Sequence, residues 1–255
     1  MSLSEIVERT QLNKSTAYYL LQALLSRHAI DTDEMGRYRL GVGLIALGAA
    51  ASEGMTELGV AKRYLAELLE RMNVTIIIYQ RIAPSEIMLI DKLERVRRVR
   101  ITVPLGARMP IQGGSYSRVF LAYDSVDEVD QLLEHGLHAL TPKSITDIEA
   151  FKEELELVRQ RGWTLDHEGF ALGVSTVAAP IFGSDGSVRL VGAAVTFTSS
   201  LSDETAEQYG STLRDTCNHI SQIIRGTKLS LPDSVALPSR VAQTGRIALW
   251  ACSRR

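Results

Sequence analysis

The chain has 255 residues, of which 45 % are hydrophobic and 23 % are charged, a balance typical of folded globular proteins and not of disordered or fibrous chains. Its length fits one large domain or two unequal ones. The formal net charge of −2 excludes a polycation, so any contact with nucleic acid must come from a local patch. Two cysteines are too few for a disulfide framework or a zinc ribbon. No segment supplies the roughly 20 apolar residues of a membrane span and none looks like a signal peptide, so we expect a cytoplasmic protein without membrane contact.

The first forty residues predict two short helices and a hairpin. Ser2 and Glu5 have the spacing of a capping box, which starts a helix. Asn13 can cap a second helix, in which apolar residues recur at helical spacing over residues 17–25. Two short alternating runs within residues 30–40 then predict a β-hairpin.

Helix, tight turn, helix and a two-stranded wing is the order of a winged helix-turn-helix, whose second helix enters the DNA major groove. An ordinary helix pair packed on a hairpin is the alternative. Charge does not decide between the two, because residues 1–43 carry five basic and five acidic side chains. The placement of the basic residues favours DNA, since Lys14 starts a helix and Arg37 and Arg39 share one face of the hairpin. The expected DNA-contacting residues are Lys14, Ser15, Thr16, Tyr18, Tyr19, Arg37 and Arg39.

The rest of the chain predicts an α+β domain. A stretch rich in glycine and alanine, residues 44–56, predicts a linker helix, and a further helix runs through residues 58–68. Runs typical of strands lie at residues 74–79, 86–93, 100–103, 163–166, 175–182 and 189–197. Helical stretches lie at residues 115–123, 126–134, 147–161 and 203–225. Because hairpins join most of the strands, we expect an antiparallel sheet flanked by helices.

No motif identifies an enzyme. The run from Gly113 to Ser117 lacks the last glycine of the G-x-S-x-G motif. Asp166, His167 and Glu168 are adjacent in a strand, so their side chains alternate in direction and cannot readily chelate one metal ion. We therefore expect no catalytic residue, no metal and no cofactor. The arginine-rich run over residues 95–100 is typical of a solvated hairpin, with nucleic-acid contact as the less favoured alternative.

Three polar residues could line a pocket. Asp166 ends a short apolar strand and precedes a loop with glycine, so it can face a cavity. Thr176 and Thr196 alternate with apolar residues on the last two strands. Both threonines can point inward, but each can equally lie on an exposed face, and the pattern does not decide between these placements.

The sequence resembles the IclR family of bacterial transcriptional regulators. The matching stretches are Leu3-Ser-Glu-Ile6, Asn13-Lys-Ser-Thr16 with Leu20-Leu21, Gly36-Arg-Tyr-Arg-Leu-Gly41, Pro104-Leu-Gly-Ala-Arg-Met-Pro110, Arg161-Gly-Trp, Asp166-His-Glu and Gly173-Val-Ser-Thr-Val-Ala-Ala-Pro180. The resemblance implies a winged helix-turn-helix (residues 1–43), a linker helix (44–56), a GAF-like effector domain (57–226) and a tail (227–255). It implies a homodimer or homotetramer whose binding to double-stranded operator DNA responds to a small organic acid or an aromatic effector.

The resemblance also implies an effector site. Gly114 and Ser115 fall in a loop whose backbone meets the ligand, Asp166 matches a polar pocket residue, and Thr176 and Thr196 fall where small polar side chains line the cavity.

The family has a helix before Leu3 that this sequence lacks. That helix would cover the apolar side of residues 3–7 and part of the face of Leu20 and Leu24, each large side chain gaining about 1.5–3 kcal/mol from burial. We therefore expect either that the true start lies upstream or that this module does not work. In the second case the alternative function is a GAF-like protein that binds small molecules and has a truncated, non-functional DNA-binding module.

Overall fold

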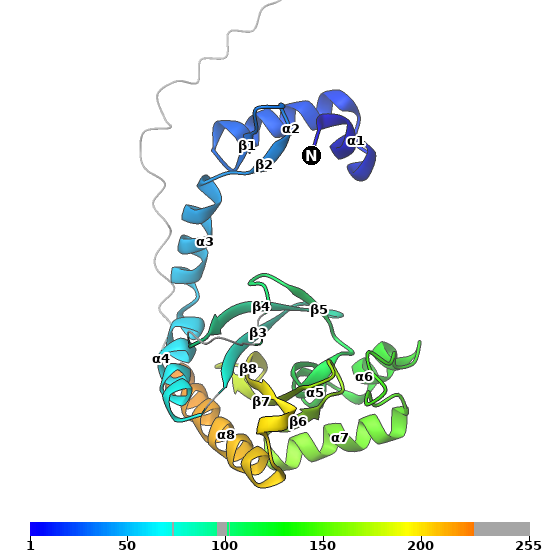
Figure 1. Ribbon diagram of the computed structural model, residues 1–255, viewed down its shortest axis with the longest axis vertical. Coiled ribbons are helices and arrows are strands. Elements are labelled where there is room, and N and C mark those ends of the chain that lie inside the picture. Colours follow the sequence, from blue (N-terminus) through cyan, green and yellow to red (C-terminus); the bar gives the residue numbers. More distant parts are fainter. Residues whose placement is uncertain (73, 96–100, 102, 227–255) are drawn as a thin grey trace, which may run out of the picture.

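The computed structural model describes residues 1–72, 74–95, 101 and 103–226. The N-terminal part contains the elements α1 (Leu3–Thr10), α2 (Lys14–Ser26), β1 (Ile30–Thr32) and β2 (Tyr38–Leu40) (Figure 1). The predicted capping box is present, because Ser2 Oγ accepts the N–H of Glu5 at 3.3 Å and a Glu5 carboxylate oxygen accepts the N–H of Ser2 at 2.7 Å. Asn13 Oδ1 accepts the N–H of Thr16 at 2.8 Å and so caps α2, as predicted.

The hairpin β1–β2 leads directly into the helix α3 (Gly43–Gly54). The backbone N–H of Gly41 donates to the carbonyl of Ala29 at 2.9 Å, and that of Gly43 donates to the carbonyl of His28 at 2.8 Å. A Cβ atom on Gly43 would lie 2.6 Å from the carbonyl oxygen of Arg27, so a side chain does not fit there. The start of α3 is thus packed against the residues that follow α2.

A six-stranded sheet forms the larger part of the molecule, in the order β5-β4-β3-β8-β7-β6 with every neighbouring pair antiparallel. Its strands are β3 (Thr75–Ala83), β4 (Glu86–Leu93), β5 (Arg108–Pro110), β6 (Thr164–His167), β7 (Val174–Phe182) and β8 (Val188–Phe197). The helices of this part are α4 (Thr56–Arg71), α5 (Gly114–Ala122), α6 (Val126–Leu133), α7 (Ile148–Arg161) and α8 (Asp203–Gly226), and the 3-10 turn η1 (Thr198–Ser200) follows β8. The predicted α+β class is confirmed.

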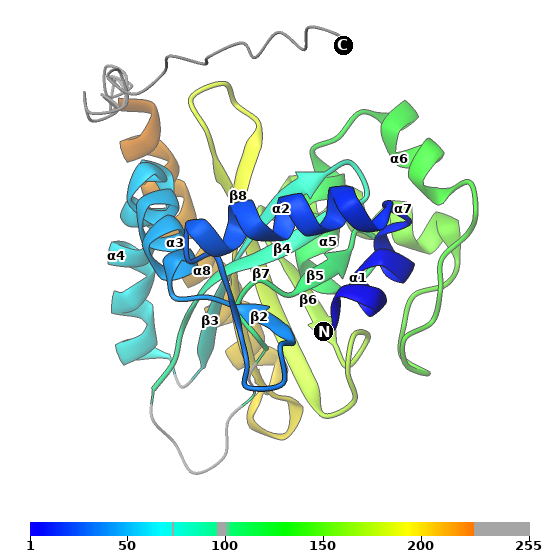
Figure 2. The ribbon, with the colours of Figure 1, turned by 90° about the horizontal axis from the view of Figure 1, so that it is seen from above.

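Each face of the sheet has its own apolar core. On one face Ile76, Ile78 and Ala194 pack with residues of α4 and α8. On the other face Ile77 and Val195 pack with residues of α5, α6 and α7. Figures 1 and 2 show α4 and α8 together on one side of the sheet and α5 to α7 on the other. Alternate residues of each strand therefore face different helices.

The edge of the sheet differs from the sequence prediction. A strand is expected at residues 100–103, but residues 100 and 102 lie outside the described part of the chain, and residues 101 and 103 belong to no strand. The strand next to β4 is instead the short β5, which the sequence pattern does not predict. The tail at 227–255 and most of the arginine-rich run, residues 96–100, also lie outside the described part. Within that part no helix has the length and apolar character needed to cross a bilayer.

Candidate functional site

The helix α2 turns a polar and aromatic side to solvent. Its buried residues are Ala17 and Leu21, which are 2 % and 7 % exposed. Tyr18 is 47 % exposed and Tyr19 is 73 % exposed, with the two rings edge to face at a centroid distance of 6.2 Å. The other side chains expected to contact DNA are also exposed, namely Lys14, Ser15, Thr16, Arg37 and Arg39. These seven residues are called the α2–wing surface below.

One arginine of this surface already has a partner. Arg37 Nε lies 3.0 Å from a carboxylate oxygen of Asp33, across the turn of the hairpin. The backbone N–H of Arg37, followed by its side chain, lowers the pKa of Asp33 below the ordinary value. Part of the positive charge of Arg37 is therefore balanced within the wing.

Apolar surface is exposed on the N-terminal helices, as expected. No residue of α1 is buried. Leu20 is 52 % exposed and Leu24 is 44 % exposed on α2. These helices bury few of their apolar side chains.

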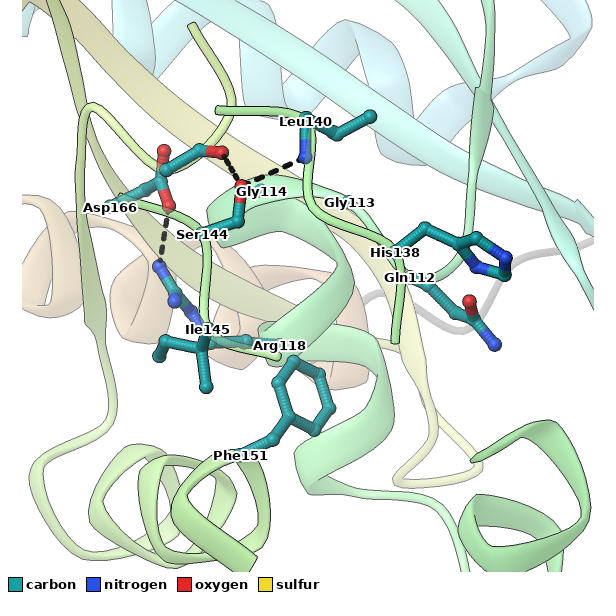
Figure 3. Close-up of a pocket in the computed structure, with 11 residues that line it drawn as sticks. Gln112, Gly113, Gly114, Arg118, His138, Leu140, Ser144, Ile145, Phe151 and Asp166 are labelled. Carbon is teal, nitrogen blue, oxygen red and sulfur yellow. Dashed lines mark hydrogen bonds and ion pairs between the residues drawn. The ribbon is translucent and has the colours of Figure 1, made fainter. Parts of the chain in front are cut away.

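A small cavity lies beside the N-terminus of α5 (Figure 3). Its free volume is about 20 Å³, which holds roughly one water molecule. The residues that line it are Gln112, Gly113, Gly114, Arg118, His138, Leu140, Ser144, Ile145, Phe151, Asp166 and Gly169. Ser144 holds the covering segments together, because its Oγ accepts the N–H of Leu140 at 2.9 Å and donates to the carbonyl of Gly169 at 2.6 Å.

The start of α5 has no side-chain cap. Gly113 is the N-cap residue and supplies no side chain, and Gly114 follows with a φ of 67° that favours glycine. All residues from Ser115 to Ala122 are buried. The first N–H groups of a helix lack partners within the helix and attract negative charge, so this buried N-terminus favours an anionic group.

A buried ion pair forms one wall of the cavity. Arg118 Nη2 lies 3.0 Å from Asp166 Oδ1, and the side chains are only 7 % and 6 % exposed. The same Nη2 donates to the carbonyl of Leu165 at 2.9 Å, and Asp166 Oδ2 accepts the N–H of Phe170 at 2.9 Å. Arg118 Nε is buried and has no hydrogen-bond partner among the described residues. Arg118 is not among the site residues that the sequence pattern predicts.

The structure places the predicted effector residues in different surroundings. Gly114 and Asp166 both line the cavity. Ser115 is 1 % exposed, and its Oγ has no hydrogen-bond partner within the described part of the chain. Thr176 lies opposite Asp166 in the pairing of β6 with β7, so these two side chains share the face that carries α5.

Thr196 lies on the other face of the sheet. It stands opposite Ser175, whereas Thr176 stands opposite Val195. Because successive residues of a strand point to opposite faces, the two threonines cannot line one cavity. The prediction that both threonines line the same pocket is therefore wrong for Thr196. The sequence pattern does not determine the register of β7 with β8, and this register decides which face each threonine lies on.

No group of three or more histidine, cysteine, aspartate or glutamate side chains that could hold a metal occurs in the described ranges.

Two family patterns match the chain. The pattern described as "Bacterial transcriptional regulator IclR C-terminal" matches residues 52–222, and that of the "IclR helix-turn-helix domain" matches residues 1–34. The HTH-type transcriptional repressor AllR of Escherichia coli (strain K12) is 29 % identical over 223 residues, which cover 86 % of this chain and 82 % of AllR. An uncharacterized HTH-type transcriptional regulator of Haemophilus influenzae is 32 % identical over 193 residues, 73 % of this chain and 72 % of the relative.

A solved structure points to the same family as the sequence comparisons. The crystal structure of an IclR transcriptional regulator from Alicyclobacillus acidocaldarius matches with a TM-score of 0.81 and 32 % sequence identity, covering 88 % of this chain and 90 % of that one. With the sequence patterns, the exposed helix-turn-helix and the antiparallel sheet domain, this likeness shows that the chain belongs to the IclR family of bacterial transcriptional regulators, which bind DNA through a helix-turn-helix.

Proposed function

We propose that this regulator reads operator DNA with the α2–wing surface, and that a small organic acid or aromatic effector bound beside α5 changes its affinity for DNA. The observation that carries this is the exposure of all seven residues of that surface, while α2 buries only Ala17 and Leu21 against its neighbours. Residues 1–43 form the DNA-binding unit of the proposal, 44–56 the linker and 57–226 the effector domain. No catalytic step is required.

The proposed contacts divide by chemistry. Ser15, Tyr18 and Tyr19 lie nearest the bases when α2 enters the major groove, with Thr16 beside them. Lys14 and the wing residues Arg37 and Arg39 contact phosphates, which fix the orientation but carry no sequence information.

The working unit is a homodimer or homotetramer. Two copies of α2 in a symmetric dimer reach half-sites separated by one turn of DNA. The linker helix α3 exposes two large apolar side chains, Ile45 at 74 % and Leu47 at 63 %. These two side chains point to different sides of the helix, and exposed large apolar side chains favour packing against a second copy.

The chemistry of the effector follows from the start of α5. Asp166 balances the charge of Arg118, but the Nε–H of Arg118 has no partner among the described residues, so this N–H and the uncapped, buried helix N-terminus both favour an oxygen acceptor such as a carboxylate. A cavity of about 20 Å³ is too small for an organic acid, so the covering segments around Ser144 and Gly169 must move apart when the effector enters.

Binding to the DNA upstream of the gene tests the proposal. The wild-type protein is expected to protect a region of this DNA in footprinting, with an affinity that falls steeply as salt rises. Lys14→Ala is expected to weaken binding to all sequences and to reduce the salt slope by about 1, while Tyr19→Ala alters the sequence preference. Lys143→Ala, an exposed lysine on the sheet domain, is the matched control and leaves the affinity unchanged. Absence of protection at low salt contradicts the proposal.

A second candidate is a GAF-like protein that binds small molecules through the sheet domain and does not regulate through DNA. The exposure of Leu20 and Leu24, with no buried residue in α1, favours this candidate, because so small a core stabilises a DNA-binding unit poorly. Salt dependence distinguishes the two, since only a protein that contacts phosphates loses DNA affinity in proportion to the counterions it releases.

A further inference from the structure

Tyr116 carries a hydroxyl group whose burial is not compensated. The residue is 3 % exposed, and its Oη atom has no hydrogen-bond partner among the described residues. A buried hydroxyl without a partner costs free energy, because it has lost its hydrogen bonds to water. Such a group in a native protein calls for an explanation, and a hydrogen bond to a ligand that binds there is one.

The hydroxyl lies close to a residue that lines the cavity. A Cβ atom built on Gly113 would lie 2.9 Å from Tyr116 Oη, 3.5 Å from Leu140 Cδ1 and 3.6 Å from Phe170 Cδ2. Gly113 and Leu140 both line the cavity beside α5. The hydroxyl therefore lies behind Gly113, one residue away from the lining of the cavity and next to the uncapped first turn of α5.

Neighbouring rings hold the tyrosine in place. The ring of Tyr79 lies 4.7 Å from that of Tyr116, and the ring of Phe170 packs edge to face with it at 6.0 Å. Phe170 is itself fixed by its backbone hydrogen bond to Asp166. A ring held on two sides directs its hydroxyl with little loss of conformational freedom on binding.

The hydroxyl stays protonated at physiological pH. Burial raises the pKa of Tyr116 well above its ordinary value of 10.0, and the charges of Tyr79 and Asp166 raise it further. Tyr116 therefore has a proton to donate, and the uncapped helix start beside it favours the oxygen of an anion as the acceptor.

We infer that Tyr116 donates a hydrogen bond to the bound effector and thereby selects effectors that present a carboxylate or similar oxygen to the first turn of α5. This inference rests on the proposed function, since it assigns a specificity-determining residue to the same site. An effector without an oxygen acceptor leaves the hydroxyl unpaired and is bound less tightly.

The variant Tyr116→Phe tests this inference with two effects of opposite sign. Without effector, removal of the unpaired hydroxyl is expected to raise the melting temperature by about 2 to 4 °C. With effector, loss of the hydrogen bond to a charged oxygen is expected to weaken binding by about 10- to 100-fold. Calorimetric titration of the full chain with pyruvate, benzoate and 4-hydroxybenzoate measures the affinity. A role confined to packing does not give both effects.

The matched control is Tyr123→Phe, which removes the same atom at the other end of α5, where Tyr123 is 38 % exposed. It is expected to leave the affinity for the acids unchanged. Equal affinities of the wild type and Tyr116→Phe for an acid that binds contradict the role of Tyr116 alone. If none of the three acids binds the wild type, both the proposed acid effector and the role of Tyr116 are contradicted.

Discussion

At the scale of single residues, the pair of Arg118 and Asp166 is buried in the sheet domain and held by several hydrogen bonds. Both carboxylate oxygens of Asp166 are used inside the protein, one by Arg118 and one by the N–H of Phe170. A buried ion pair is weak evidence for stability, since desolvation offsets the attraction, but removal of one partner leaves a buried charge uncompensated. Asp166 thus organises the cavity wall in addition to lining it.

The variant Asp166→Ala is therefore expected to lower the free energy of unfolding by about 3 to 5 kcal/mol, because Arg118 stays buried without its counter-ion. Urea denaturation of the sheet domain measures this. The double variant Arg118→Met with Asp166→Leu is the control, and it is expected to recover most of the loss because it removes both charges. A single variant as stable as the wild type, with the double variant no better, argues against this assignment.

The sequence identifies some residues of the site and misses others for physical reasons. Asp166 stands out because it ends an apolar strand before a loop. Arg118 does not, because a charged residue on a short helix is usually solvated, and only the packing of α5 on the sheet shows that it is buried. Thr196 is misplaced because the facing of a strand depends on its register with the next strand.

At the scale of elements, the contact between the start of α3 and the residues that follow α2 joins the DNA-binding unit to the linker. Gly41 and Gly43 let the backbone at the start of α3 approach the backbone of Arg27 and His28 more closely than any side chain permits. Because closely packed backbone atoms resist displacement, we expect this contact to be stiff. A tilt of α3 is therefore expected to carry the end of α2 with it.

The variant Gly43→Ala tests this joint. Its Cβ would lie 2.6 Å from the carbonyl oxygen of Arg27, so the segment must shift, at a cost of about 1 to 3 kcal/mol. We expect weaker DNA binding in fluorescence anisotropy, with the melting temperature of the sheet domain unchanged.

The control for this joint lies in the same helix. Gly48 has no atom within 4 Å of a Cβ built on it, so Gly48→Ala is expected to leave DNA binding intact and to stabilise α3 by about 0.5 to 1 kcal/mol. Equal DNA affinities for the two variants rule out a stiff contact at Gly43.

The elements themselves are largely predictable from the sequence, with one informative exception. The caps at Ser2 and Asn13 and the periodicity of α2 depend on local spacing, which the sequence displays directly. The strand β5 has only three residues and ends in Pro110. So short a run shows no alternation, and it becomes a strand only because it pairs with β4 at residues 86–88.

At the scale of the whole molecule, two parts of unequal core size share one chain. The N-terminal part buries Ala17, Leu21 and Ala29, whereas the sheet domain has an extensive apolar core on each face. Since apolar burial supplies most of the stability, the two parts are expected to unfold in separate steps.

Thermal unfolding followed by circular dichroism is expected to show a first transition that removes the helices of the N-terminal part and a second that removes the sheet domain. A ligand stabilises the state that binds it, so operator DNA is expected to raise the first transition and a bound acid the second. A single transition that shifts as a whole with either ligand is the result that contradicts independent cores.

The packing of α4 on α8 brings the two ends of the sheet domain together. Tyr64 meets His219 at a ring distance of 5.0 Å, and a groove that Arg71 shares with Thr212 continues the pairing, so the two helices run in opposite directions. The chain therefore enters this domain at Thr56 close to where α8 ends at Gly226 (Figure 1). A domain with adjoining ends can be spliced into a surface loop of an unrelated host without stretching either junction, so residues 56–226 are expected to tolerate such an insertion.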